Sequence, residues 1–147
     1  MAPIPKHLLV AAGSLGPRLP APAVAAAIAR GVEAAGRPHP DLCPIDLAHE
    51  APEEVRALLD AVDFDVRMRA ARAVVVACER LQERALAGSF TFEIATRARQ
   101  AGVPAYAITA SNVLDPFDAR ILDLQLILEA RTAKALVAAG RRLAELA

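Results

Sequence analysis

Two charged residues, Glu79 and Arg80, come directly after an apolar run at 72–78. That run has the composition of a strand buried on both faces of a parallel sheet. Because ligands of open α/β sheets bind beyond the carboxyl ends of the strands, these two side chains could contact a small polar ligand. Cys78, the last residue of the run, is expected to be a buried and unreactive thiol.

The first glycine-containing loop also follows an apolar run. Gly13, Ser14 and Gly16 could present backbone N–H groups to a phosphate before the next helix begins. The loop matches neither the dinucleotide nor the P-loop pattern, it has no lysine, and Pro17 lacks an N–H donor. An ordinary glycine turn therefore explains it as well, and Arg18 in the same loop is a further candidate for contact with an anion.

Polar residues follow the apolar run at 104–110 in the same way. Asn112, Asp115 and Asp118 could hold a hydrated divalent cation, because such cations prefer oxygen ligands. Asp-Pro and Ser-Asn pairs are equally typical of turns, and we expect no metal site. The candidates for ligand contact at the carboxyl ends of the strands are Ser14, Arg18, Glu50, Glu79, Arg80, Ser111, Asn112 and Asp115.

The elements that must position these residues alternate along the chain. Short apolar runs alternate with amphipathic stretches, a pattern typical of βα units around a parallel sheet. It predicts a single three-layer αβα Rossmann-like domain over residues 1–147, with a mostly parallel sheet of about five strands. Strands are expected at 7–13, 41–46, 72–78, 104–110 and 120–128, and helices over 22–36, 52–62, 89–101 and 130–146.

Capping residues mark the boundaries of one of these helices. Ser89 is a good N-cap for the helix over 89–101, while Gly102 and the nearby Pro104 are typical of a helix end.

The segment 63–71 fits neither element. It is too charged for a strand and too short to be assigned as a helix. The overlapping stretch 60–67 has three carboxylates, Asp60, Asp63 and Asp65, but lacks the glycine and the distal glutamate of a calcium loop, and we interpret it as a solvated junction.

Composition excludes several classes of partner. The chain has 147 residues, 55% of them hydrophobic, and a formal net charge of zero. Without a basic block, nucleic acid is not expected as a partner, and no apolar segment has the length of a membrane span. Cys43 and Cys78 form no CxxC or zinc pattern, and the apolar run at 8–12 is shorter than a signal-peptide core, so a cytoplasmic location is expected.

The order of segments resembles the bacterial two-domain glycerate kinases. Their opening strand, APDSFKGSLSA motif and first helix look like AAGSLGPRLPAPAVAAAIARG at 11–31. Their FDERL motif, strand, TGEGRLDxQSLAGK loop and following helix look like FDVRMRAARAVVVACERLQERALAGSFTFEIATRARQAGVPAYAI at 64–108. The resemblance implies a Rossmann-like core, here without the family's inserted second domain, whose junction would fall near 60–65.

The motif positions that the resemblance links to catalysis are changed. Gly13 and Gly16 stand where the family has Asp and Lys, while Cys78, Gln82 and Ser89 stand where it has Glu, Asp and Lys. Phosphoryl transfer depends on positioned cations, magnesium-binding carboxylates and a base. The resemblance therefore implies that no catalytic residue is retained.

These observations favour a non-catalytic binding or interaction protein without a cofactor. Loss of the inserted domain would expose apolar surface, which a homodimer could cover, and a small anion or nucleotide could bind at the strand ends. One alternative is an active kinase that phosphorylates glycerate or a related hydroxy acid with ATP and Mg²⁺, the metal being held by Asp115 and Asp118 or by Glu50 and Glu79. A further alternative is a structural partner subunit without a ligand.

Overall fold

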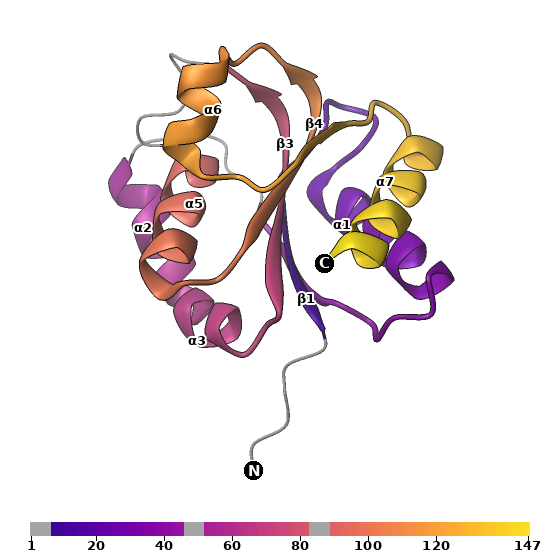
Figure 1. The fold of residues 1–147 in the computed structure, drawn as a ribbon, viewed down its shortest axis with the longest axis horizontal. Coiled ribbons are helices and arrows are strands. Elements are labelled where there is room, and N and C mark those ends of the chain that lie inside the picture. Colours follow the sequence, from indigo (N-terminus) through magenta and orange to yellow (C-terminus); the bar gives the residue numbers. More distant parts are fainter. Residues whose placement is uncertain (1–6, 46–51, 83–88) are drawn as a thin grey trace.

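The fold is a five-stranded parallel sheet between two layers of helices (Figure 1). The computed structural model describes residues 7–45, 52–82 and 89–147. The strands are β1 (Leu8–Ala12), β2 (Asp41–Pro44), β3 (Ala73–Leu81), β4 (Ala105–Asn112) and β5 (Ile127–Glu129). The helices are α1 (Ala21–Ala34), α2 (Pro52–Ala61), α3 (Phe64–Arg69), α5 (Phe90–Ala101), α6 (Pro116–Leu122) and α7 (Ala133–Leu146).

The sheet has the order β2-β1-β3-β4-β5, and every strand pair is parallel. Helices α1 and α7 cover one face, and α2, α3, α5 and α6 lie on the other (Figure 1). Each face has its own apolar core, so β1 is buried along its whole length. The predicted three-layer αβα architecture is confirmed.

The expected strand over 120–128 is wrong. Its first residues belong to helix α6, and the strand itself is only Ile127–Glu129. Asp115 caps α6 by accepting a hydrogen bond from the Asp118 N–H at 2.8 Å, and Pro116 occupies the first turn. A proline in that position is well suited to begin a helix, which overrides the alternating apolar residues further along.

The interpretation of 60–67 as a solvated junction is also wrong. Helix α3 places Phe64 and Met68 one turn apart on a single side, and both are fully buried in the core. Arg97 of α5 pairs with Asp60 of α2 at 3.0 Å and with Asp65 of α3 at 3.3 Å. Two of the three carboxylates that made the segment resemble a solvated turn are therefore partners of one arginine.

Strand boundaries near the expected site lie further along the chain than the sequence indicates. Strand β3 continues past Cys78 to Leu81, so Glu79 and Arg80 belong to the strand instead of following it. Cys78 is buried, as expected. Strand β4 likewise extends to Asn112, two residues beyond the strand expected at 104–110.

The predicted caps of α5 are confirmed. The Ser89 hydroxyl accepts a hydrogen bond from the Phe92 N–H at 3.1 Å. Gly102 ends the helix with a φ of 71°, a left-handed conformation that glycine adopts without strain.

Helices α1 and α7 pack so closely that only glycine, which has no Cβ, fits where they cross. A Cβ added to Gly31 would lie 2.0 Å from the Val137 carbonyl oxygen, and one added to Gly140 would lie 2.4 Å from the Ile28 carbonyl oxygen. The backbones themselves are therefore in contact where the helices cross. The buried side of α7 is formed by Leu136, Ala139, Gly140, Leu143 and Ala144, whereas Ala133 is exposed.

Helix α3 is joined to the edge strand β2 by an arginine. The Arg67 guanidinium donates two hydrogen bonds to the Asp41 carboxylate, at 2.6 and 2.8 Å, and a third to the Leu42 carbonyl at 2.9 Å. These hydrogen bonds lower the pKa of Asp41 below its ordinary value, although partial burial opposes the shift. Burial also raises the pKa of the nearby Cys43 thiol.

Asp41→Asn should lower the free energy of unfolding at neutral pH by about 1–2 kcal/mol, because the hydrogen bonds to a charged carboxylate are weakened. The pKa of Asp41 is lower in the folded state than its unfolded value of about 3.9, so the stabilisation is present above that pH and is lost as the pH falls through the folded pKa. Urea unfolding at pH 7 and at acidic pH should show that the two proteins differ less in acid. An equal difference at both pH values would contradict this assignment.

Within the parts of the chain that the structure describes, no helix is both long enough and apolar enough to cross a bilayer.

Candidate functional site

The candidate residues within the described ranges come together at the carboxyl edge of the sheet. Ser14 and Arg18 lie in the loop after β1, and Glu79 and Arg80 end β3. Ser111 and Asn112 end β4, and Asp115 caps α6. Glu50 lies outside the described residues. Parallel strands bring their carboxyl ends to one edge, which is why the sequence was sufficient to group these positions.

The loop after β1 closes on itself. The Gly13 N–H donates to the Ala77 carbonyl at 2.9 Å, which extends the pairing of β1 with β3 by one residue. The Leu15 N–H donates to the Leu19 carbonyl at 2.8 Å, and the Leu19 N–H donates to the Gly16 carbonyl at 3.2 Å. The N–H groups of Gly13, Leu15 and Leu19 are thus engaged within the sheet and the loop, which favours the interpretation of the loop as a glycine turn.

Two apolar side chains pack beside the backbone at the end of β1. The order of strands reverses between β1 and β3, and this switch point is where ligands of such sheets bind. On one face a Cβ added to Gly13 would lie 3.0 Å from Cζ of Phe90, so that ring lies against the Gly13 backbone. On the other face Leu15 is buried in the core of α1 and α7. Among the described residues, an apolar side chain therefore packs on each face of the sheet at the end of β1.

Glu79 and Arg80 project into different surroundings. The Glu79 carboxylate lies beside the loop after β1, with Oε1 3.9 Å from the position that a Cβ on Gly16 would take. Gly16 has a φ of 97°, which accounts for glycine there. Arg80 is exposed and pairs in register with Ser111 of β4.

Thr109 joins the ends of β3 and β4. Its side chain is fully buried, and its hydroxyl lies 3.2 Å from the carbonyl oxygens of both Glu79 and Ser111. The Ser111 N–H donates back to that hydroxyl at 3.3 Å. Sequence reasoning missed this residue, although a polar residue inside the apolar run 104–110 was a signal for it.

Asn112 and Asp115 have structural roles at the end of β4. The Asn112 side-chain oxygen accepts a hydrogen bond from the Leu114 N–H at 3.1 Å, and Asp115 caps α6. Loss of hydration and the neighbouring Asp115 carboxylate both raise the pKa of Asp118. Among the described residues no group of three or more His, Cys, Asp or Glu side chains could hold a metal ion.

The end of β5 contributes a further charged pair that sequence reasoning missed. The Arg131 guanidinium donates to the Ala110 carbonyl at 2.9 Å and lies 3.9 Å from the Glu129 carboxylate. The Asn112 N–H donates to that carboxylate at 3.4 Å. These contacts were not foreseen because the strand was expected at 120–128, whereas β5 is Ile127–Glu129. The pair ties the last strand to β4.

The fold and the strand order define the class of protein. It is a single α/β domain whose strand order is that of flavodoxin-like doubly wound sheets. No protein-family model matches the sequence, and no curated protein matches it either. A response regulator receiver domain from Rhodospirillum rubrum is similar in structure, with a TM-score of 0.53 and 14% identity over 95% of this chain and 92% of that one.

Two further solved structures are similar. A protein from Burkholderia pseudomallei K96243 described as pilus assembly-related has a TM-score of 0.50 and 17% identity, over 95% of this chain and 90% of that one. A protein from Salmonella typhimurium LT2 described as glycerate kinase 2 has a TM-score of 0.48 and 13% identity over 73% of this chain. This chain spans 27% of the length of that kinase structure. At such identities the likenesses concern the fold alone.

Proposed function

We propose that this chain is a non-catalytic α/β domain that acts by binding another protein and not by turning over a ligand. The observation that carries the proposal is the apolar packing at the switch point, where Cζ of Phe90 lies 3.0 Å from a Cβ position on Gly13 and Leu15 is buried on the other face of the sheet. A small-molecule site of this fold needs a concave space at that place.

The hydrogen bonding at the same edge supports the proposal. Asp115 serves as a helix cap, Asn112 closes a turn and Thr109 joins two strands. A catalytic site needs polar groups that are free to act on a substrate. One pair that the sequence offered for magnesium, Asp115 and Asp118, is joined by a hydrogen bond from the Asp118 N–H to the Asp115 carboxylate. In the other pair, Glu79 lies at the end of β3 and Glu50 lies outside the described residues.

Thermal unfolding with candidate ligands tests the proposal. A ligand present at one hundred times its Kd should add about 2.7 kcal/mol of stability, which is a rise of roughly 5–10 °C in Tm for a domain of this size. We expect no rise with ATP and Mg²⁺, with glycerate, or with all three together. The folded protein is used without modification, and direct measurement of ATP turnover provides the second readout.

A clear rise in Tm with ATP and Mg²⁺ would contradict the proposal. Glu79→Gln then serves as the diagnostic variant, because Glu79 is exposed and lies beside the loop after β1. A rise that this substitution abolishes would place a functional nucleotide site at the carboxyl edge. Arg56→Gln, an exposed substitution on α2, is the control for a general change of charge.

A further inference from the structure

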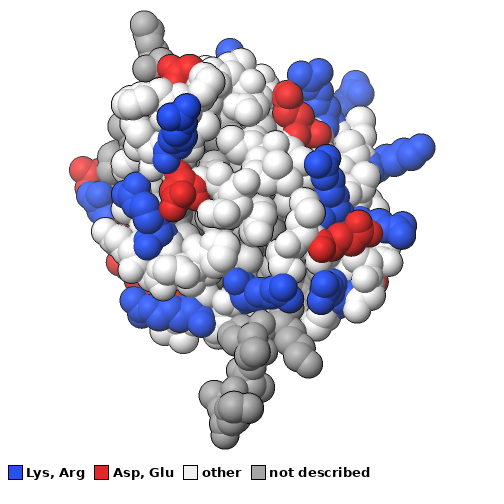
Figure 2. All heavy atoms as spheres, viewed as in Figure 1, with Lys and Arg blue, Asp and Glu red and all other residues white. Residues whose placement is uncertain are grey.

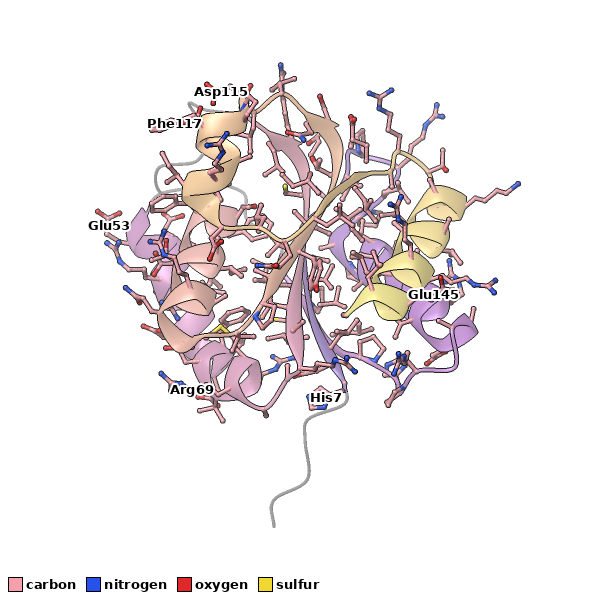
Figure 3. The ribbon with its side chains drawn as sticks, viewed as in Figure 1. His7, Glu53, Arg69, Asp115, Phe117 and Glu145 are labelled. Carbon is pink, nitrogen blue, oxygen red and sulfur yellow. The ribbon has the colours of Figure 1, made fainter. Side chains whose placement is uncertain are left out.

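Helix α6 exposes large apolar side chains along one side. Val113, just before the helix, is 52% exposed, and Phe117 and Ile121 are 69% and 47% exposed. Phe117 and Ile121 are four residues apart and therefore neighbours on the helix surface. Figure 3 shows Phe117 at the outer side of α6, directed away from the sheet. Such side chains gathered in one place on a folded domain are typical of an interaction site.

An open groove lies next to these side chains, between α5 and α6. Its volume is about 60 Å³, and it is lined by Phe92, Ala95, Thr96, Arg99, Ile121 and Leu122. Arg99 spans the two helices by donating a hydrogen bond to the Ile121 carbonyl at 2.9 Å. The α5/α6 face, meaning Val113, Phe117, Ile121 and this groove, thus carries a projecting aromatic ring and a groove side by side.

We infer that the α5/α6 face is the contact surface of a homodimer; the inference rests on the proposed function and names the partner as a second copy of this chain. A two-fold dimer uses the same surface twice, so one surface must offer both a projecting group and a place to receive it. The α5/α6 face meets this requirement, with Phe117 as the projecting group and the groove beside Ile121 as the receiving site. Buried aromatic anchors that enter pockets dominate the energy of most interfaces.

The charges around the face favour a second copy over a partner of strong charge. Arg99 in the last turn of α5 and Arg120 of α6 accompany three carboxylates on α6 and at its ends, Asp115, Asp118 and Asp123, so both signs of charge border the apolar side chains and nearly cancel. Figure 2 shows a mainly uncharged surface over α6 with single charges of each sign, while Lys and Arg side chains gather along the side of α7. Two copies of a face with nearly balanced charge meet without strong electrostatic repulsion. A strongly acidic or basic partner would find no opposite net charge on this face.

The region near 60–65, where the absent domain was expected to leave exposed apolar surface, fits a dimer less well. Phe64 is fully buried there, and Asp60 and Asp65 are paired with Arg97. Val66 is 68% exposed but stands between two charged residues of the same short helix. Val66 is therefore the matched control for Phe117: an apolar side chain of nearly equal exposure on another helix.

Sedimentation equilibrium or light scattering tests the dimer over protein concentrations from about 1 µM to about 1 mM, a range that covers weak association. Wild-type protein should form dimers as the concentration rises. Phe117→Ala should weaken dimerisation about 30-fold or more, the effect expected for an aromatic anchor. Val66→Ala should leave it unchanged. Circular dichroism checks that both variants remain folded, as their exposure predicts.

A wild-type monomer at every concentration would overturn the inference, as would a dimer that Phe117→Ala does not weaken or that Val66→Ala weakens equally. Failure of the dimer is distinguishable from failure of the proposed function. If the protein is a monomer and nucleotide leaves its Tm unchanged, only the second copy is excluded as the partner. A rise in Tm with ATP and Mg²⁺ contradicts the proposed function whatever the oligomeric state.

Discussion

Gly31→Ala is expected to lower the free energy of unfolding by at least about 2 kcal/mol, although alanine favours helices over glycine by about 1 kcal/mol. The added methyl group would lie 2.0 Å from the Val137 carbonyl oxygen and 2.7 Å from the Arg141 nitrogen. Both are backbone atoms, so no side chain can rotate away, and α1 and α7 must separate. Both helices pack on one core, and a shift of either disturbs its burial.

Thermal and urea unfolding measure this effect, which corresponds to a fall in Tm of roughly 4–8 °C. Gly140→Ala should act in the same direction, because its methyl group would lie 2.4 Å from the Ile28 carbonyl oxygen. Ala138→Ser is the matched control: it also adds one heavy atom to α7, but on the exposed side. If Gly31→Ala were as stable as the wild type, the close contact between α1 and α7 would be wrong.

Phe64→Ala is expected to lower the free energy of unfolding by about 3–5 kcal/mol, the usual cost of truncating a fully buried phenylalanine. Phe64 is 0% exposed and belongs to the core formed by α2, α3 and α5. A loss of this size is a large part of the total stability of an ordinary domain, which is about 5–15 kcal/mol. The variant should therefore unfold at a much lower denaturant concentration.

Val66→Ala provides the control for Phe64→Ala, because it truncates an exposed side chain two residues away on the same helix. It should change the free energy of unfolding by no more than about 0.5 kcal/mol. Urea midpoints of the two variants decide between the observed helix and a solvated junction. Similar, small losses for both would favour the junction.

Local patterns were sufficient for much of the fold and for the grouping of the candidate residues. The apolar runs near Val10, Val75 and Ile108 are doubly covered strands, as their continuous burial requires. The caps at Ser89 and Gly102 were readable because capping depends on residues only a few positions apart. The grouping of candidate residues at one edge followed from parallel topology alone.

The chemistry of that edge could not be read in the same way. Whether the loop after β1 cradles a ligand depends on hydrogen bonds to Ala77 and on the Phe90 ring, and both residues lie more than sixty positions away in the sequence. The sequence is compatible with Asn112 and Asp115 as turn residues or as residues that contact a ligand. Only the backbone geometry decides that Asn112 closes a turn and that Asp115 caps a helix. Likeness in local motifs to a kinase family carries no information on these contacts.

By itself the sequence determined the layers, the parallel sheet and the ends of α5, because these depend on periodicity and on capping over one or two turns. Only the tertiary structure decided that 64–69 is a helix with Phe64 in the core, that 116–122 is a helix before a short strand, and that α1 and α7 meet through Gly31 and Gly140. Each of these outcomes depends on which distant surface a segment meets. Burial against that surface outweighs the weak local preferences of a short, mixed segment.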